Sequence, residues 1–334
     1  MHMSKNTPKQ LESLNWGMIG CGNVTDVKSA PCYQKVPGFN LVGVTNRTLS
    51  KAQTFATQNN IEHIFENAKA LVESKHIDAV YIATPPDSHL EYASLVASVG
   101  KPCCIEKPLA PSYAESEAIL KAFQGSQTPL FVAYYRRSLP RFEKVKLWLE
   151  QKVIGDIRHI QWNYCRPPSE SDLAKVANWR TDKNVAYGGY FDDLASHGLN
   201  LFEFLLGEIS DAHGTVANQQ KLYSACDSIA GVWLHENNIT GTGFWNFASH
   251  LYRDEVEILG SDGELRFSVF EDQPVRYSNR STSEEIFIAN PENVQIHHVE
   301  NMRRHLNGSA YHPSTGESGV KTAWVMDKIL GKIV

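Results

Sequence analysis

The sequence predicts a two-part α/β protein, in which a doubly wound parallel sheet is followed by a domain with an open, mostly antiparallel sheet. Up to about residue 133, short apolar strands alternate with helices. Residues 78–83, DAVYIA, are apolar almost throughout, which is typical of a strand buried on both faces. After residue 134 the expected strands are longer, and Ser261-Asp262-Gly263 is a hairpin signal.

A glycine-rich turn, Gly20-Cys21-Gly22, ends the first strand, and a helix is expected from about Val24 toward Val36. Gly20 permits the tight turn, and Gly22 lets a phosphate approach bare backbone. The helix N-terminus then offers free N–H groups and a positive dipole end. Thr25 occupies the third glycine position of the G-x-G-x-x-G pattern, so the turn alone is equally compatible with an ordinary strand-turn-helix.

The other elements of the first part follow in alternation. Strands are expected at 39–44, 61–65, 78–83, 102–106 and 129–133, and helices at 49–59, 68–73, 111–123 and from a cap at Asp87 or Ser88 to Gly100. The short spacing between them predicts the parallel sheet.

The second part begins with an amphipathic helix at 139–152, an alternating strand at 157–165 and an irregular stretch at 166–190. A helix at 191–206 is closed by Gly207, and further strands are expected at 214–218, 229–235, 240–248, 256–259 and 264–270. A last helix, at 318–333, is expected to pack back across the domain junction. We therefore divide the chain into domains at 14–133 and 134–312, followed by a C-terminal segment at 313–334.

The composition favours a globular protein of the cytoplasm. Of the 334 residues, 42% are hydrophobic and 21% charged, and the net charge of -5 argues against a nucleic-acid or acidic-membrane partner. No stretch approaches the roughly 20 apolar residues that span a bilayer, and residues 1–13 are too polar for a signal peptide. The six cysteines have neither metal-ligand spacing nor disulfide-scaffold density, so we expect reduced thiols and no metal.

Three loops at the carboxyl ends of the expected strands carry candidate functional residues. In the first, Asn46 stands where a carboxylate would bind the ribose diol of NAD, and Arg47 and Lys51 are positively charged. A 2′-phosphate would attract this pair, so the loop favours NADP over NAD. The alternative is that both are solvated surface charges.

The second loop is Glu106-Lys107-Pro108. An ammonium at the end of a strand points into the crevice, where it can bind a substrate oxygen and stabilise developing negative charge. Glu106 would anchor the cofactor or the lysine. The alternative is a surface lysine in an ordinary turn.

The third candidate is the pair Asp193 and His197, which share one face of a helix at i and i+4. A neighbouring aspartate can orient a histidine, which then suits general acid–base chemistry near neutral pH. The alternative is a helix-surface contact. Asp193 and His197 have no evident third residue with which they could bind zinc, so we expect no metal here.

Taken in order, these pieces resemble the Gfo/Idh/MocA family (glucose–fructose oxidoreductase, inositol dehydrogenase and relatives) from about Leu14 to Gly331. The motifs that carry the resemblance are GCGNV, IATPPDSH at 82–89, EKP at 106–108, the segment 134–137, Asn178-Trp179-Arg180 and GGYFDDLASHGLN at 188–200. It implies an N-terminal Rossmann domain and a C-terminal open sheet. The lysine–proline bond of this motif is often cis in the family, so the resemblance implies a cis bond between Lys107 and Pro108.

Residue roles follow from the resemblance. Lys107 matches the family's catalytic lysine, and Asp193 and His197 match its D-x-x-x-H pair. Trp179 and Arg180 match a motif that reaches the nicotinamide end of NADP in relatives such as 1,5-anhydrofructose reductase. The expected cofactor-binding residues are Gly20, Cys21, Gly22, Asn23, Val24, Asn46, Arg47, Lys51, Thr84, Pro85, His89, Glu106, Lys107, Tyr134, Trp179 and Arg180.

The expected function is an NAD(P)-dependent oxidoreductase, with NADP favoured and NAD possible, that acts on a sugar, a polyol or a related carbonyl compound. His197 would take the hydroxyl proton, Lys107 would orient the oxygen and Asp193 would orient His197. The alternatives are an NAD-dependent glycosidase of the same family and a non-catalytic NADP-binding sensor. The aromatic surface near Phe244 predicts a homodimer or homotetramer formed through the C-terminal sheet.

Overall fold

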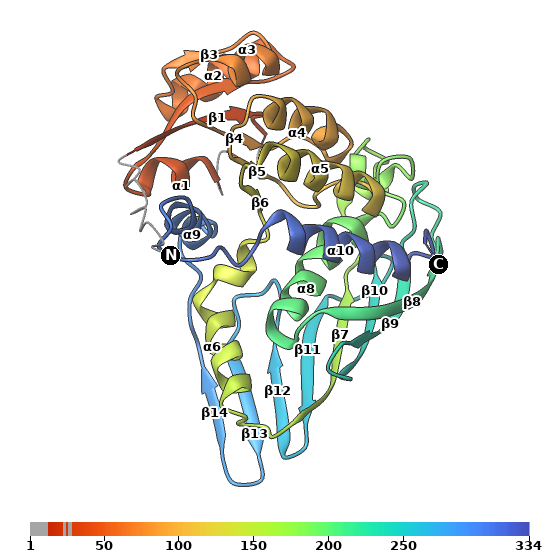
Figure 1. The fold of residues 1–334 in the computed structure, drawn as a ribbon. Coiled ribbons are helices and arrows are strands. Elements are labelled where there is room, and N and C mark those ends of the chain that lie inside the picture. Colours follow the sequence, from red (N-terminus) through yellow and green to blue (C-terminus); the bar gives the residue numbers. More distant parts are fainter. Residues whose placement is uncertain (1–12, 23–24, 26–28, 334) are drawn as a thin grey trace.

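The structure is a computed structural model that describes residues 13–22, 25 and 29–333. It contains two sheets that follow one another in the chain, with the N-terminal sheet at the top of Figure 1 and the larger sheet below it. None of the helices in the described residues is long and apolar enough to cross a membrane.

The N-terminal sheet has six strands in the order β3-β2-β1-β4-β5-β6, and every neighbouring pair is parallel. This is the doubly wound topology expected from the sequence, and its crevice lies at the carboxyl ends of β1 and β4. The strands are β1 (Leu14–Ile19), β2 (Phe39–Thr45), β3 (His63–Ile64), β4 (Ala79–Ile82), β5 (Cys103–Ile105) and β6 (Leu130–Val132).

Helices cover both faces of this sheet. They are α1 (Ala30–Lys35), α2 (Leu49–Asn59), α3 (Ala68–Glu73), α4 (His89–Ser98), which follows the 3-10 turn η2 (Pro86–Ser88), and α5 (Tyr113–Ser126). β4 is buried on both sides: Tyr81 belongs to one apolar cluster and Val80 to the other. A strand buried in this way must be apolar throughout, as the run 78–83 is. Most of the expected start of the first helix, at 23–24 and 26–28, lies outside the described residues.

The second sheet has eight strands in the order β14-β13-β12-β11-β7-β10-β9-β8. Its pairs are antiparallel except for β7 and β10, which are parallel, so the sheet is mixed and mostly antiparallel. The strands are β7 (Ile157–Cys165), β8 (Ile209–Ala217), β9 (Ser228–His235), β10 (Thr240–Asn246), β11 (Arg253–Gly260), β12 (Gly263–Phe267), β13 (Val275–Asn279) and β14 (Ser283–Ile286). β13 and β14 were not predicted from the sequence.

One face of this sheet is covered by α6 (Pro140–Glu150) and α8 (Tyr190–Leu206). α8 lies close to β7 because it carries Gly198 there: a Cβ at this position would lie 2.2 Å from the Trp162 ring. The side chains of β9 alternate between this core and the opposite face, so that Trp233 is buried while Val232 and Leu234 are exposed.

Two C-terminal helices connect the parts. α10 (Gly316–Ile329) contacts α5 and β6 of the first part and α8 and β8 of the second, and it runs between the two sheets in Figure 1. α9 (Ile296–Leu306), which was not predicted from the sequence, packs on α1. Its Val299 and Met302 belong to the same apolar cluster as Trp16 and Tyr33, so the chain between 296 and 306 packs with the N-terminal sheet.

Candidate active site

The glycine-rich turn adopts a conformation that requires glycine. Gly20 has φ +95, and a Cβ there would lie 2.9 Å from the carbonyl oxygen of Ala83. Among the described residues, no atom lies within 4 Å of a Cβ built at Gly22, so its backbone is open to a ligand. Thr25 is buried and donates from N and Oγ1 to the carbonyl oxygen of Gly22, at 2.9 and 2.6 Å, so the threonine closes the turn. Asn23 and Val24 lie outside the described residues.

Two adjoining cavities begin at this turn. The outer cavity has a volume of about 830 Å³ and lies at the carboxyl ends of β1, β2 and β4; its lining includes Gly20–Gly22, Asn46, Arg47, Lys51, Thr84 and Pro85. The inner cavity, of about 490 Å³, shares Gly22, Ala83, Thr84 and Pro85 with it and continues to Lys107, Asp193 and His197. A long ligand with a phosphate-bearing middle fits this shape, because the bare backbone at Gly22 lies where the two cavities meet.

At the far end of the outer cavity, Arg47 and Lys51 are exposed, and neither is in an ion pair with another described residue. Asn46 folds back locally: its Oδ1 accepts from the backbone N of Thr48 at 2.9 Å. Two uncompensated cations therefore border this end, although Glu66 also lies in the lining.

His89 does not line either cavity. It is fully buried, and its Nδ1 and Nε2 lie 3.0 and 2.9 Å from the carbonyl oxygens of Leu109 and Thr84. Burial lowers the pKa of His89. The predicted contact with a cofactor is thus replaced by a structural one, in which the ring connects the loops that follow β4 and β5.

Glu106 and Tyr134 are also more deeply placed than expected. Glu106 lines the inner cavity, but its carboxylate accepts hydrogen bonds from the Tyr81 hydroxyl and, at 3.0 Å, from Nε2 of Gln295. Tyr134 is 2% exposed, and its ring packs edge-on to His197 with centroids 6.0 Å apart. Tyr134 therefore packs against His197 and is almost fully buried.

Lys107 comes directly after β5, and its peptide bond to Pro108 is cis, as the resemblance implies. Its ammonium forms an ion pair with the carboxylate of Asp193, which lies in the first turn of α8. Nε of Arg180 lies 2.5 Å from the other carboxylate oxygen of Asp193. Burial alone would raise the pKa of Asp193, but the charges of Lys107 and Arg180 hold it well below its ordinary value. The aspartate is therefore an anion that holds two cations together.

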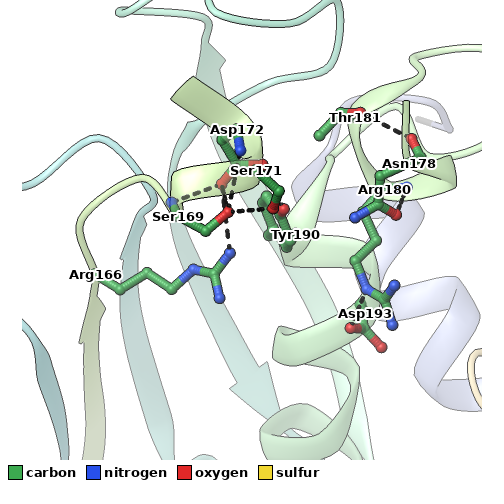
Figure 2. A network of polar contacts seen from close by, with 9 residues as sticks. All are labelled: Arg166, Ser169, Ser171, Asp172, Asn178, Arg180, Thr181, Tyr190 and Asp193. Carbon is green, nitrogen blue, oxygen red and sulfur yellow. Dashed lines mark hydrogen bonds and ion pairs between the residues drawn. The ribbon is translucent and has the colours of Figure 1, made fainter. Parts of the chain in front are cut away.

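Figure 2 shows how the segment between β7 and α8 brings Arg180 to this position. Asn178 begins the 3-10 turn η4 (Trp179–Thr181) by accepting from the backbone N of Arg180 at 3.1 Å, and the Arg180 side chain then reaches Asp193. The other end of the segment is anchored by α7 (Glu170–Leu173), whose Asp172 accepts from the Tyr190 hydroxyl at 2.6 Å. The guanidinium of Arg166 lies 4.0 Å above the Tyr190 ring.

His197 lines the same inner cavity as Lys107, but its observed partner differs from the expected one. Its Nδ1 lies 3.0 Å from Nη1 of Arg136, whereas the carboxylate of Asp193 is directed to Lys107 and Arg180. Since arginine only donates, Nδ1 accepts, and the neutral ring carries its proton on Nε2. The prediction that Asp193 orients His197 is therefore corrected: Arg136 makes that contact.

The inner cavity is also lined by residues for which the sequence predicted no role, among them the polar or aromatic side chains of Tyr135, Arg136, Phe270 and Gln295. Arg136 lies within the segment 134–137 that carried the resemblance, but nothing in the sequence distinguishes it from Arg137. Phe270 is the last residue of the strand expected at 264–270, and Gln295 precedes α9, which was not predicted. No sequence pattern distinguishes either residue. Among the described residues, no group of three His, Cys, Asp or Glu side chains could hold a metal ion.

An NAD(P)-binding oxidoreductase is the class that this fold and site define, and comparison with known proteins agrees. Residues 14–134 match the model of an oxidoreductase family with an NAD-binding Rossmann fold, and residues 142–266 match the GFO/IDH/MocA C-terminal domain. The chain is 33% identical over 319 residues to Oxidoreductase P35 of Formosa agariphila, covering 95% of this chain and 98% of that protein. The protein belongs to the Gfo/Idh/MocA family of NAD(P)-dependent oxidoreductases.

Other relatives are more distant. The chain is 26% identical to scyllo-inositol 2-dehydrogenase (NADP(+)) IolU of Bacillus subtilis, covering 94% of this chain and 95% of that protein. It is also 26% identical to levoglucosan dehydrogenase of Pseudarthrobacter phenanthrenivorans, over 70% of this chain and 58% of that protein. The solved structure of a levoglucosan dehydrogenase complexed with NADH and L-sorbose superposes with a TM-score of 0.87 at 20% identity, covering 96% of each chain.

Proposed function

We propose that this oxidoreductase transfers a hydride between a nicotinamide cofactor and a carbinol or carbonyl carbon of a sugar or polyol. The observation that carries the proposal is that Lys107 and His197 line one cavity, which adjoins the glycine-turn cavity. The names of the relatives, which include scyllo-inositol, levoglucosan and D-xylose dehydrogenases, support this substrate class. They do not favour the glycosidase or the sensor.

The cofactor would lie across the two cavities, with its adenosine half in the outer cavity and its nicotinamide half toward the inner one. Gly20, Cys21 and Gly22 would hold the pyrophosphate, Asn46 and Arg47 the adenosine ribose, and Thr84, Pro85 and Trp179 the nicotinamide half. When bound, the nicotinamide accepts or supplies the hydride. The exposed cations Arg47 and Lys51 support a preference for NADP, since a 2′-phosphate would give them the anion that the described residues do not.

The residues of the inner cavity would act on the substrate oxygen. The Lys107 ammonium donates a hydrogen bond to that oxygen and stabilises its developing negative charge. In the oxidation direction, Nε2 of His197 takes the hydroxyl proton, which requires the tautomer with its proton on Nδ1. Arg136 must then release Nδ1, since both atoms would be donors. Asp193 holds Lys107 and Arg180 in place.

We also propose that the protein forms a homodimer or homotetramer in the cytoplasm. The uncovered face of the second sheet carries Val232 and Phe244, which are 52% and 40% exposed, and Leu234 lies beside them on β9. Apolar groups clustered on one sheet face usually meet a partner. The buried thiols of Cys103, Cys104, Cys165 and Cys226, which form no disulfides, are consistent with a reducing compartment.

A screen of sugars, polyols and their carbonyl derivatives with NADP(H) and NAD(H) tests the function, with absorbance of the reduced nicotinamide as the measurement. We expect turnover of at least one such compound, lost in Lys107→Ala. Tight cofactor binding without turnover of any compound would contradict the proposal and favour the sensor. Cofactor that stays bound through purification, with glycoside cleavage, would favour the glycosidase.

A further inference from the structure

Arg136 is a buried cation that lines the inner cavity next to His197. It lies in the 3-10 turn η3 (Tyr135–Ser138) and is 6% exposed. Its Nε donates to the carbonyl oxygen of Val269 at 2.9 Å, and its Nη1 donates to Nδ1 of His197 at 3.0 Å. The guanidinium lies 4.5 Å from the centroid of the Phe270 ring and 4.9 Å from that of Tyr135. Its position is therefore well defined by four contacts.

None of these contacts supplies a negative charge. Lys107 and Arg180, the other cations of the cavity, share the carboxylate of Asp193. By contrast, no carboxylate of the described residues lies within ion-pair distance of Arg136, and its Nη2 makes no hydrogen bond among them. A buried charge without a counter-ion is costly, unless a ligand supplies the opposite charge.

We propose that Arg136 binds a carboxylate of the substrate, and therefore that the enzyme acts on an acidic sugar or polyol of the uronate or aldonate class. This inference rests on the proposed function of the site. The N–H groups left on Nη1 and Nη2 lie in one plane, which matches the two oxygens of a carboxylate. The Phe270 and Tyr135 rings pack against the guanidinium, with centroids 4.5 and 4.9 Å away, so its plane is held in a fixed orientation toward a carboxylate.

The proximity of Arg136 to His197 adds a mechanistic consequence. The carboxylate and the reacting oxygen would be held by neighbouring side chains, which favours a small acidic sugar over an anion at the end of a long substituent.

The test compares acidic and neutral sugars of the same configuration, such as glucuronate and gluconate with glucose, and galacturonate with galactose. Wild type, Arg136→Gln, Arg136→Lys and Arg141→Gln are assayed with both cofactors. Arg141 is the matched control, because it is also buried and donates to the carbonyl oxygen of Val269, at 2.9 Å, but does not line the cavity. Thermal unfolding of each variant monitors the fold.

We expect kcat/KM of wild type to be at least about tenfold higher for the acid than for its neutral counterpart, as a charge-assisted contact predicts. Arg136→Gln should remove this preference, mainly through KM for the acid, while the Kd of the cofactor stays the same. Arg136→Lys should retain part of it, and Arg141→Gln should retain all of it. If Arg136→Gln fails to fold, the comparison of Arg136→Lys with wild type and Arg141→Gln decides whether the preference depends on Arg136.

Equal or better turnover of the neutral sugars by wild type would overturn the proposal, as would an unchanged preference in folded Arg136→Gln. Better turnover of sugar phosphates than of the carboxylates would overturn the assignment of a carboxylate. If no sugar is turned over, the proposed function fails, and calorimetry with glucuronate and galacturonate in saturating NADP⁺ then tests the site itself. Binding that is lost in Arg136→Gln supports the carboxylate site, and absent or unchanged binding overturns it.

Discussion

The ammonium of Lys107 and the carboxylate of Asp193 form an ion pair across the junction between the two sheets, although the residues are 86 positions apart. Lys107 comes from the end of β5 and Asp193 from the start of α8, with side chains 13% and 8% exposed. Arg180 adds a second cation to the same carboxylate. The pair thus fixes the position of a potential catalytic amine by an anion from the other part of the chain.

We predict that Asp193→Asn impairs both stability and catalysis. The substitution leaves the partly buried charges of Lys107 and Arg180, whose side chains are 13% and 28% exposed, without an anion, which costs at most about the 3–5 kcal/mol of breaking a fully buried pair. We expect a lower unfolding midpoint in urea and a loss of turnover of at least about tenfold, as the ammonium is no longer held. Asp192→Asn is the control, since Asp192 lies next to it in α8 but accepts from the backbone N of Gly188. Equal effects of both variants would contradict the prediction.

Removal of either group that faces the reacting oxygen should slow the reaction. Proton transfer by a positioned side chain contributes about 10²–10⁴-fold, so His197→Ala should reduce kcat by about this factor. Removal of a donor that stabilises a developing oxyanion costs about 10²–10³-fold, so Lys107→Ala should reduce kcat by about that factor. Neither should change the Kd of the cofactor by much, because the pyrophosphate and adenosine contacts lie in the other cavity. Steady-state kinetics and fluorescence titration measure the two quantities. Near-normal turnover by His197→Ala would exclude it from the mechanism.

The choice of cofactor should depend on Arg47. A hydrogen bond to a charged group is worth about 1.5–3 kcal/mol, so Arg47→Ala should weaken NADP binding about tenfold or more and leave NAD binding nearly unchanged. Titration of both cofactors into both proteins measures this. Lys69→Ala is a matched control, since Lys69 also lines the outer cavity but pairs with Glu73 at 3.8 Å. Tighter binding of NAD than of NADP by wild type would refute the preference.

Acid should destabilise the contact of the C-terminal region with the N-terminal sheet through His312. Burial lowers the pKa of His312 to about 4. Its Nδ1 accepts from the backbone N of Ser314 at 2.9 Å, and its Nε2 lies 3.1 Å from the carbonyl oxygen of His298. The neutral ring satisfies both contacts, and a proton on Nδ1 would break the first.

Because the pKa of His312 in the folded state lies below the ordinary value of about 6.5, the unfolded chain binds the proton more readily. The contribution of His312 to stability is therefore complete above about pH 6.5 and is lost as the pH falls toward about 4. Between about pH 8 and about pH 5 the loss from this residue should be about 2 kcal/mol. Urea unfolding at both pH values should show a smaller loss for His312→Asn than for wild type. An equal loss in the two proteins would be evidence against this role.

Association should depend on the uncovered face of the second sheet. Val232→Glu places a charge in the exposed apolar cluster and should shift the protein toward the monomer, as measured by light scattering at micromolar concentration. Tyr311→Glu is the control, because Tyr311 is 74% exposed but lies far along the chain from this sheet, after α9. A monomeric wild type would contradict the proposed assembly.

Local sequence patterns predicted those elements in which buried apolar residues recur at the spacing of a helix or a strand. The bounds expected for α2, α3 and β7 agree with the structure, because their apolar spacing and flanking residues are unambiguous. β13 and β14 were missed since they are largely exposed and polar, with only Val275 fully buried. α9 was missed because most of its residues are polar or charged, and its narrow apolar stripe, formed by Val299 and Met302, gives only a weak helical pattern in the sequence.

The sequence by itself determined the parallel sheet, the glycine turn and the residue types of the site, because strand ends and turns are specified by neighbouring residues. Only the tertiary structure decided which of these side chains contact one another. The i,i+4 spacing placed Asp193 near His197, but Lys107 and Arg180, brought in from distant segments, are stronger partners for a buried carboxylate than a neutral ring. Arg136 took the place beside His197 for the same reason: contacts between distant segments depend on how the sheets and helices pack, which no local pattern encodes.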